Sequence, residues 1–378
     1  MGLERRPRLN PRSRGVAAGL AVGGCLTWNV SNVGAVADPL AEHYDVSLTT
    51  IGLLTTALFV THLAVQLPAG RGADRFGSQR VALVAVGAVV AGNCLLLTDD
   101  GVELALLARA IVGIGSGAAF VAGLDLVRAA GGGAALQGLY GGATMAGGGL
   151  ALMVVPALTE ATSWRAAYWS AALLAVAAAI PTVMAAGLPR IGHAGAWILR
   201  DRELLPIGVL QAATFGLAVI AGNWVVPFLE RSGVTPGAAG LAGGLILFVG
   251  IATRPLGGVL AGRVRGRLLV AIGLVGTSIG AAVLAIDGPL WVSALGAFVL
   301  GLTAGLPFAG IFAAAQRTRP DAPGAAIALV NACAVLTILV GTPLAGLAFE
   351  HGRDGRLAFA GIAALAGTAL LALRRARV

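Results

Sequence analysis

The sequence predicts an all-α polytopic membrane protein, with twelve transmembrane helices arranged as two pseudo-symmetric six-helix bundles. Of its 378 residues, 57% are hydrophobic and only 11% are charged, whereas soluble domains carry roughly 25% charged residues. The apolar residues form runs of about 17 to 27 positions, and a helix needs about 20 to cross the hydrocarbon core. The alternating pattern of a transmembrane barrel is missing, so the runs predict helices.

Twelve apolar runs follow one another between charged breaks. They cover residues 15–37, 48–69, 81–98, 104–127, 134–158, 166–187, 205–229, 236–261, 268–286, 290–315, 323–349 and 357–373. Only one connection is long, and it divides the chain into an N-terminal bundle (1–187), a central loop (188–204) and a C-terminal bundle (205–378). The first run also resembles a signal peptide, but it exceeds the usual length of about 7–15 residues, and its removal would break the symmetry.

The arginines predict the orientation in the membrane. All 26 basic residues are arginine. If the amino terminus lies inside the cell, the inside segments hold 20 of them, the outside segments hold 4, and Arg109 and Arg254 lie within spans. Because positive charges are retained on the cytoplasmic side, we expect a multi-pass protein of the cell membrane with both termini and the central loop in the cytoplasm.

Composition and spacing exclude several classes of function. The basic residues behind the net charge of +9 are scattered one loop at a time, which argues against a nucleic-acid partner. A chain without lysine has neither a P-loop lysine nor a Schiff-base amine. The three cysteines lie singly, so no metal and no cofactor are expected. The spans also contain no paired carboxylates of the kind that enzymes use, so an enzyme is not expected. The expected partners are the lipid bilayer and a small-molecule solute, and a monomer is expected.

The segment after span 2 carries the most specific motif. Residues 70–80 read Gly-Arg-Gly-Ala-Asp-Arg-Phe-Gly-Ser-Gln-Arg, which resembles the loop G-x-x-x-D-R-x-G-R-(R/K) between helices 2 and 3 of the major facilitator superfamily. The matching positions are Gly70, Asp74, Arg75 and Gly77. Span count, central loop and orientation extend the resemblance over the whole chain. It implies a transporter of two bundles that works by alternating access.

In that family the loop is a cytoplasmic gating latch, which must break during transport. Ser78 stands where the family has arginine, so the resemblance implies an ion-pair relay through Arg75 or Arg80, with Asp125 at the inner end of span 4 as the acid. Asp74 can accept hydrogen bonds from a helix N-terminus, where negative charge is favoured. The alternative is that Asp125 and Arg128 are interfacial charges without a role in gating.

Two arginines within spans are candidates for solute contact, since an ionisable group in the membrane marks a functional site by default. Arg109 begins an R-x-x-x-G-x-G pattern that resembles the family. It is a candidate for coupling proton movement or for binding an anion, and its alternative is a structural arginine bonded to backbone carbonyls. Arg254 precedes Pro255 in span 8. With the Trp-Asn element of span 1, it resembles the nitrate and cyanate branch, in which an arginine faces the solute. A planar guanidinium suits planar oxyanions or carboxylates, and the alternative is a snorkelling arginine.

Tryptophan–asparagine pairs occur at nearly the same depth in spans 1 and 7. Amides in hydrocarbon need partners, so we predict that they face a wet central cavity, and helix-to-helix hydrogen bonds are the alternative. The predicted substrate-binding residues are Asn29, Asn32, Arg109, Asn223, Trp224, Arg254 and Asn331.

No ATP site is visible, so transport must use an ion gradient or the gradient of the solute. Protons are the expected ion, with His62 in span 2 as the proton-coupling candidate. Two functions stay open: a porter for a small anion, and a proton-coupled efflux pump for drugs or metabolites. Aromatic residues make up only 5% of the chain and no clear acid lies mid-span, which favours the anion porter.

Overall fold

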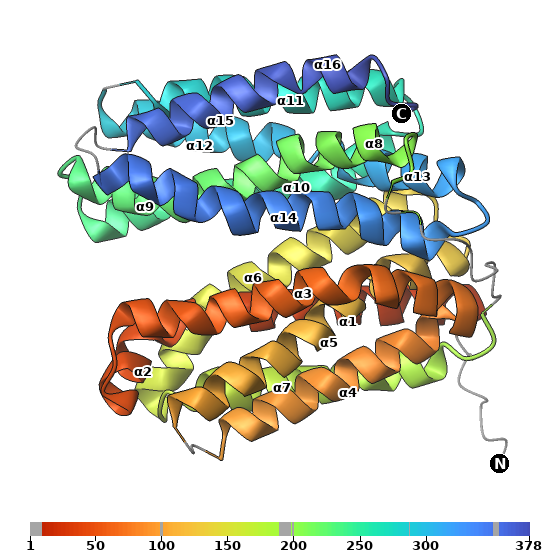
Figure 1. Ribbon diagram of the computed structural model, residues 1–378, viewed down its shortest axis with the longest axis horizontal. Helices are drawn as coiled ribbons and strands as arrows, with labels where there is room; N and C mark the ends of the chain where they lie inside the picture. Colours follow the sequence, from red (N-terminus) through yellow and green to blue (C-terminus); the bar gives the residue numbers. More distant parts are fainter. Residues whose placement is uncertain (1–9, 99–100, 189–197, 199, 287, 351–354) are drawn as a thin grey trace, which may run out of the picture.

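The chain is entirely helical in a computed structural model, which describes residues 10–98, 101–188, 198, 200–286, 288–350 and 355–378 (Figure 1). Within these residues, eleven helical stretches are long and apolar enough to cross a membrane. A bent pair of helices at the start of the chain raises the count to twelve. The predicted fold class is thereby confirmed.

The helices form two groups that lie one above the other in Figure 1. The first group consists of α1 (Pro11–Ser31), η1 (Gly34–Val36), α2 (Ala37–Tyr44), α3 (Leu48–Phe76), α4 (Ser78–Leu96), α5 (Val102–Ala129), α6 (Ala134–Ala161) and α7 (Ala166–Met184). The second consists of α8 (Leu204–Gln211), η2 (Ala212–Gly216), α9 (Leu217–Arg231), α10 (Pro236–Leu260), α11 (Gly266–Leu284), α12 (Leu290–Ala304), α13 (Phe308–Thr318), α14 (Pro323–Glu350), α15 (Arg356–Thr368) and α16 (Leu370–Leu373). Most of the central loop lies outside the described residues, so its boundaries stay a prediction.

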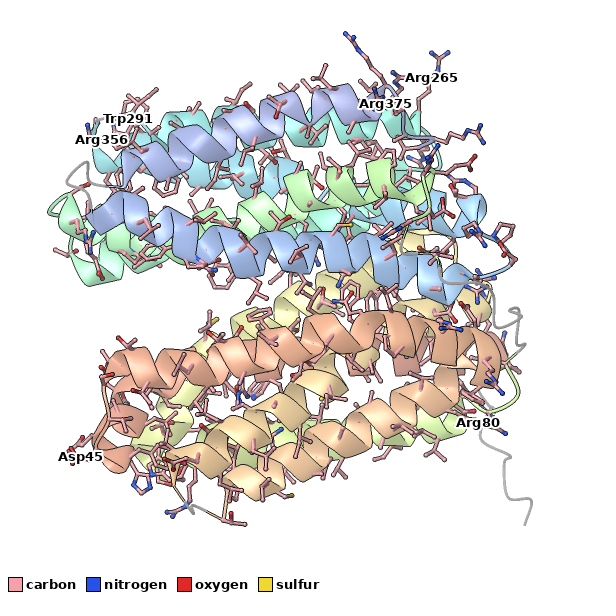
Figure 2. The ribbon with its side chains drawn as sticks, in the orientation of Figure 1. Asp45, Arg80, Arg265, Trp291, Arg356 and Arg375 are labelled. Atoms are coloured by element: carbon pink, nitrogen blue, oxygen red, sulfur yellow. The ribbon has the colours of Figure 1, made fainter. Side chains whose placement is uncertain are left out.

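Helix α1 begins, and the chain ends after α16, at the same end of the molecule, which we call the terminal end; the opposite end is the far end (Figure 1). Figure 2 shows Arg80, Arg265 and Arg375 at the terminal end, and Asp45 and Arg356 at the far end. This arrangement agrees with an even number of spans.

Four spans are interrupted, although the sequence predicted each as one continuous run. Span 1 bends by 42° between α1 and the pair η1–α2. Span 7 contains the π-helical turn η2, span 10 breaks before Phe308, and span 12 breaks between Thr368 and Leu370. Pro307 explains the break in span 10, because proline cannot donate to the helix ladder. Hydropathy averages over such turns and does not reveal them.

The predicted end of span 2 at residue 69 was wrong. Helix α3 continues to Phe76, through most of the motif that the sequence analysis placed in a loop. Only Gly77 turns the chain, with φ at 93°, a conformation that favours glycine. The first arginine after the apolar run therefore does not mark the end of the helix.

The two bundles touch along glycine-lined seams. A Cβ atom on Gly70 of α3 would lie 2.5 Å from the carbonyl oxygen of Gly324 in α14. A Cβ on Gly258 of α10 would lie 2.4 Å from the carbonyl oxygen of Ala134 in α6. Small residues let helix backbones approach closely in membranes. Gly70 of the motif and Gly258 of span 8 therefore allow the two bundles to contact each other closely.

Candidate substrate site and gate

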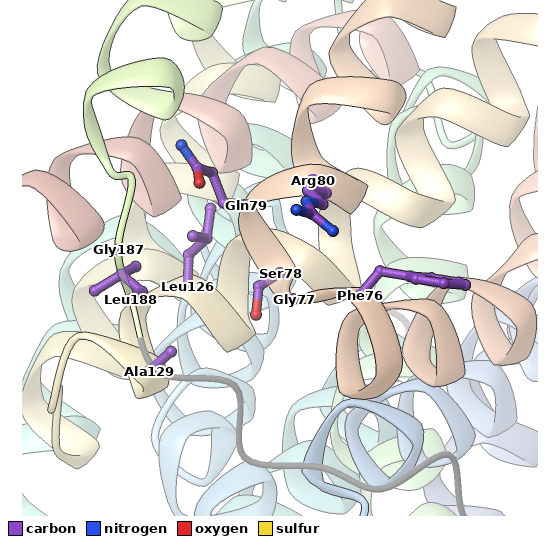
Figure 3. Close-up of a pocket in the computed structure, with 9 residues that line it drawn as sticks. All are labelled: Phe76, Gly77, Ser78, Gln79, Arg80, Leu126, Ala129, Gly187 and Leu188. Carbon is purple, nitrogen blue, oxygen red and sulfur yellow. The ribbon is translucent and has the colours of Figure 1, made fainter.

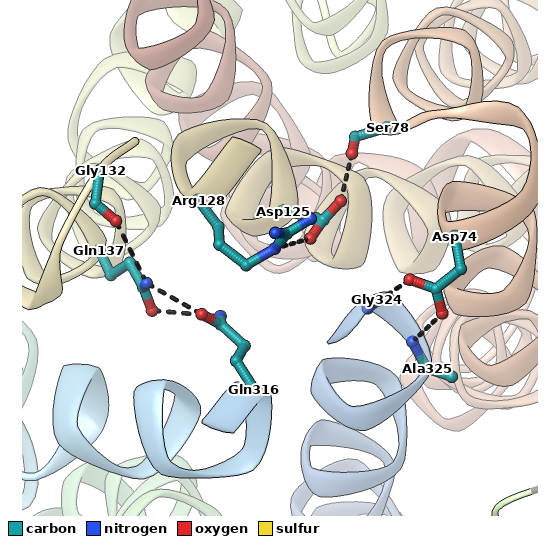
Figure 4. Close-up of polar contacts among 9 residues, drawn as sticks. All are labelled: Asp74, Ser78, Asp125, Arg128, Gly132, Gln137, Gln316, Gly324 and Ala325. Atoms are coloured by element: carbon teal, nitrogen blue, oxygen red, sulfur yellow. Dashed lines mark hydrogen bonds and ion pairs between the residues drawn. The ribbon is translucent and has the colours of Figure 1, made fainter. Parts of the chain in front are cut away.

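Asp74 joins the two bundles at the terminal end. Gly324 and Ala325, at the N-terminus of α14, donate their backbone N–H groups to Asp74 Oδ1 (2.8 Å) and Oδ2 (2.9 Å) (Figure 4). The carboxylate is only 4% exposed. A helix N-terminus has unsatisfied N–H groups and favours negative charge. The motif in the first bundle thus caps a helix of the second.

Asp125 lies beside this contact with different partners from those expected. The Ser78 hydroxyl donates to Asp125 Oδ2, and Arg128 pairs with Oδ1 from one turn further along α5 (Figure 4). Arg75 and Arg80 are exposed. Within the described residues neither pairs with Asp125, so the expected relay through Arg75 or Arg80 is wrong for this conformation. An arginine three positions along the same helix reaches the acid more directly.

Two amide pairs add further bonds between the bundles. Gln137 of α6 and Gln316 of α13 exchange hydrogen bonds of 3.1 and 3.2 Å (Figure 4). Asn331 Nδ2 in α14 donates to Gln66 Oε1 in α3 at 3.2 Å. Asn331, predicted to face a central cavity, therefore lies at the bundle interface in this structure. The two glutamines of the first pair sit near helix ends and match no motif, so the sequence analysis missed them.

Arg254 reaches across the interface from α10 to α6. Its Nη1 donates to the carbonyl oxygen of Gly141 (3.1 Å) and to Thr144 Oγ1 (2.9 Å). The guanidinium carbon lies 4.8 Å from the ring centroid of Phe215 and 4.4 Å from that of Phe308. Among the described residues, Nε and Nη2 have no hydrogen-bond partner, although a guanidinium carries five N–H donors. The side chain is 4% exposed and points to the other bundle, which does not fit snorkelling.

The two rings at Arg254 come from interrupted spans. Phe215 belongs to the π-helical turn η2, and Phe308 is the first residue of α13. Discontinuous helices at membrane depth typically occur where a transporter binds its solute. Arg254 therefore lies where spans 5 and 8 meet the interruptions of spans 7 and 10.

Several amide atoms of α3, α8 and α14 are buried without a partner. They are Gln66 Nε2, Asn331 Oδ1, and both Nε2 and Oε1 of Gln211. Gln211 is 0% exposed and lies one turn before Phe215. Each unsatisfied buried polar group costs about 1–3 kcal/mol. Gln66 and Asn331 thus leave one free donor and one free acceptor at the bundle interface. The sequence signal for Gln211 and Gln66 was a polar residue within an apolar run.

Arg109 lies inside the first bundle. Its Nη2 donates to the carbonyl oxygen of Asn29 (2.8 Å), and its Nη1 lies 3.4 Å from Asn32 Oδ1. Asn93 Nδ2 donates to Asn29 Oδ1 (2.7 Å), and Asn32 Nδ2 to the carbonyl oxygen of Ala167. All four polar side chains are 0% exposed. Because the Asn29 carbonyl belongs to the last turn of α1, Arg109 supports the bend of span 1, as a structural arginine would.

The two tryptophan–asparagine pairs do not share a cavity in this conformation. Trp28 Nε1 donates to Ser170 Oγ of α7. Trp224 Nε1 donates to the carbonyl oxygen of Thr342 (2.9 Å), and the exposed Asn223 lies 3.4 Å from the hydroxyl of the same residue. The bonds are the helix-to-helix type that stood as the alternative. Equal depth along a helix does not fix the direction in which a side chain points.

His62 lies in α3, one turn before Gln66, and is 4% exposed. Its Nδ1 lies 2.9 Å from Ser116 Oγ of α5, and that hydroxyl donates to the carbonyl oxygen of Gly113. We assign the Nδ1–H tautomer on this basis, since the serine oxygen is then the acceptor. Nε2 keeps its lone pair and has no partner among the described residues.

Arg319 fixes the loop before α14. It donates from Nε and Nη2 to Asp321 (3.0 and 2.9 Å) and from Nη1 to Asp201 Oδ2 (2.6 Å). Partial burial acts to raise the pKa of Asp201, but bonds from Arg319 and from two backbone N–H groups outweigh it, so the pKa is lowered. The hydrogen bond with Arg319 likewise lowers the pKa of Asp321. The chain before α8 is thereby tied to the loop that leads to the helix capped by Asp74.

All hydrogen bonds between the bundles, within the described residues, lie in the terminal-end halves of their helices. The molecule is therefore closed at the terminal end. A pocket of about 220 Å³ also lies there, lined by Ser78, Arg80, Leu126 and Leu188 among others (Figure 3). Its lining comes from the first bundle and the segment after α7, so it lies apart from the interface around Arg254.

Comparison with known proteins gives a consistent result. The sequence profile described as Major Facilitator Superfamily matches residues 19–210 and 207–378. No protein of curated function matches the chain significantly. Solved structures that resemble it include the E. coli fucose:proton symporter FucP, with a TM-score of 0.75, 13% identity, and coverage of 99% of this chain and 100% of that one.

A second FucP structure, described as being in the outward conformation, gives a TM-score of 0.76 at 14% identity, with coverage of 99% and 100%. The human organic anion transporter MFSD10 gives 0.73 at 15% identity, covering 98% of this chain and 100% of that one. At such identities the likeness concerns the fold alone.

Proposed function

The chain belongs to the major facilitator superfamily and is a multi-pass membrane transporter rather than an enzyme, and we propose that it carries a small anion by alternating access. The membrane is the cytoplasmic membrane, and the terminal end faces the cytoplasm, because the loop arginines gather there. The structure then corresponds to a state closed toward the cytoplasm.

The observation that carries the proposal is the environment of Arg254. A permanent positive charge lies at the bundle interface, and no carboxylate among the described residues bonds it. Such a charge is costly within a membrane, and a bound anion would offset the cost. With Nη1 anchored to α6, the N–H groups of Nε and Nη2 form the fork that binds a planar carboxylate or oxyanion through two bonds.

The same anchor gives a physical link between binding and movement. Nη1 holds Gly141 and Thr144 of the first bundle while the free edge of Arg254 holds the solute. Opening toward the cytoplasm must break these two bonds together with the Asp74 cap. A solute shifts the equilibrium only through a difference in its interaction with the two states. Contact with Arg254 supplies that difference.

Protons are the proposed coupling ion, with His62 as their carrier. His62 Nε2 is free to accept a proton, and its helix also carries Gln66, which bonds Asn331 of the other bundle. A proton bound here would compensate the charge of a co-transported anion. The bond partner of His62, Ser116, comes from the first bundle, so protonation would act on α3 next to the interface.

The test is a solute panel in proteoliposomes containing the purified protein. Uptake of small carboxylates, inorganic oxyanions, neutral sugars and amphipathic cations is measured with and without an imposed pH gradient. Saturable uptake of one anion class, stimulated by the gradient, is the expected result. Transport of amphipathic cations alone would instead support the efflux pump and remove the role proposed for Arg254.

A further inference from the structure

A groove of about 390 Å³ lies between spans 7, 11 and 12, away from the bundle interface. Val209 and Leu365 on its walls are 45% and 59% exposed, so the groove opens to the outside of the second bundle. Its lining is mainly aliphatic and includes Val209, Ala213, Leu217, Leu365, Ala369 and Ala372.

Two helix interruptions produce the groove. The π-helical turn Ala212–Gly216 forms one wall, and the break between Thr368 and Leu370 forms the other. The lining residues at these irregular turns are mostly alanines, which do not fill the space. The hydroxyls of Thr337 and Thr368 both donate to carbonyls of their own helices, at 2.9 Å. The groove therefore offers an apolar surface without free donors.

The groove lies at the depth of lipid acyl chains. Val209 follows the start of α8 at Leu204 by five residues, and Leu217 follows it by thirteen. At about 1.5 Å per residue, the groove begins roughly 7 Å from the terminal end and reaches about 20 Å. This range falls within a hydrocarbon core about 30 Å thick. The apolar molecules available at that depth are membrane lipids.

The rim of the groove at the terminal end is basic. Arg374 and Arg375 directly follow α16 and are exposed, and Arg202 is exposed just before α8. Helices α16 and α8 pack against each other, so these arginines gather at one place. Figure 2 shows Arg375 at the terminal end of the second bundle. Exposed arginines at the headgroup level attract anionic lipids.

We propose that the groove binds an acyl chain of one anionic phospholipid, whose phosphate contacts Arg374 and Arg375. Depth and lining select the acyl chain, and the basic rim selects the anionic headgroup. The site is distinct from the solute path at Arg254 and does not depend on which solute is carried. Because the π-helical turn that forms the groove also carries Phe215, the lipid would lie directly behind the wall of the Arg254 site.

The test is native mass spectrometry of the purified full chain, titrated with phosphatidylglycerol or with phosphatidylcholine of identical acyl chains. Wild type should retain phosphatidylglycerol preferentially. The double variant R374Q/R375Q should lower that preference on the order of tenfold, and A369F should lower retention of the lipid by filling the groove. The matched controls are R12Q/R317Q, which removes two exposed arginines elsewhere at the terminal end, and A364F, at an exposed site on α15.

The arginine variant changes only exposed residues and so separates loss of binding from loss of folding. Equal retention of the two lipids by wild type would mean ordinary annular lipid and would overturn the proposal. It is also overturned if the controls reduce retention as much as R374Q/R375Q does.

Discussion

Replacing Asp74 by asparagine should open the terminal end of the protein. The carboxylate accepts two backbone N–H groups of α14, at 2.8 and 2.9 Å. Asparagine keeps one acceptor oxygen but presents an amide nitrogen to the second N–H, so one charge-assisted bond is lost. Such a bond contributes about 1.5–3 kcal/mol, and the charge at a helix N-terminus adds about 0.3–1 kcal/mol.

The closed arrangement should therefore lose about 2–4 kcal/mol relative to the open one. Since 1.4 kcal/mol corresponds to a factor of ten, the open population should rise more than tenfold. Spin labels at positions 12 and 317, which are exposed in different bundles at the terminal end, report this change as longer distances in pulsed electron resonance. The native cysteines must first be replaced.

The matched control is Asp38→Asn, an exposed acid of α2 at the far end. It should leave both the distance distribution and uptake unchanged. Asp74→Asn should reduce uptake while expression stays near normal. If its distances and its uptake kinetics both equal those of wild type, Asp74 does not hold the bundles together, and the assignment of a gate at this seam is refuted.

Further predictions concern topology, coupling and stability. A single cysteine introduced at position 195 should resist impermeant reagents in intact cells, and ready labelling there would reverse the proposed orientation. His62→Gln should abolish stimulation by a pH gradient while solute exchange continues; persistent stimulation would place the proton elsewhere. Gln316→Ala removes the neutral hydrogen bonds between Gln316 and Gln137. The increase in distance between the same spin labels should therefore be smaller than in Asp74→Asn. Because the pKa of Asp201 is lowered in the folded protein, its carboxylate stabilises the folded state at pH values above its ordinary pKa of about 3.9. This stabilisation is lost as the pH falls through the lower pKa of the folded state. Thermal unfolding should thus show Arg319→Gln less stable than wild type at neutral pH, with the difference shrinking below about pH 4; a constant difference would contradict it.

The fold was largely predictable because hydropathy carries the dominant physical constraint on a membrane chain. Each span needs enough apolar residues to cross the bilayer, and the loops carry the charge. The interruptions were not predictable in this way. The residues of η2 are as apolar as their neighbours, and other spans contain prolines, such as Pro156 and Pro343, inside continuous helices, so Pro307 does not stand out. The π-helical turn packs against α14 and α15, and the hydropathy of a sequence carries no information about such contacts.

The gate was partly predictable. Asp74 was identified through the motif it resembles, but its partners Gly324 and Ala325 lie about 250 residues away and carry no side-chain signal. Only the structure shows that they begin a helix that faces α3. The partner of Asp125 was mispredicted, because the family pattern suggested an arginine on the loop where this chain uses Arg128 of the same helix.

The proposed site at Arg254 was also only partly predictable from the sequence. A charge within an apolar run identified Arg254 from sequence, while Phe215, Thr144 and Gln211 lie on other spans and matched no pattern. The same argument predicted that Arg109 contacts the solute, but in the structure its hydrogen bond goes to α1 within the first bundle. Burial of a charge in a span indicates a requirement for partners, and only the fold shows whether those partners are protein or solute.

The most direct test of the account is solute affinity in Arg254 variants, measured by equilibrium binding to folded, purified protein once the panel has identified an anion. Arg254→Lys keeps the charge but loses the planar fork. Losing one charge-assisted bond of about 1.5–3 kcal/mol should raise the dissociation constant by roughly tenfold to a hundredfold. Arg254→Ala should abolish saturable binding, and the loop variant Arg263→Lys should bind as wild type does. Wild-type affinity in a folded Arg254→Ala protein would contradict the central claim, because the anion would then bind without Arg254.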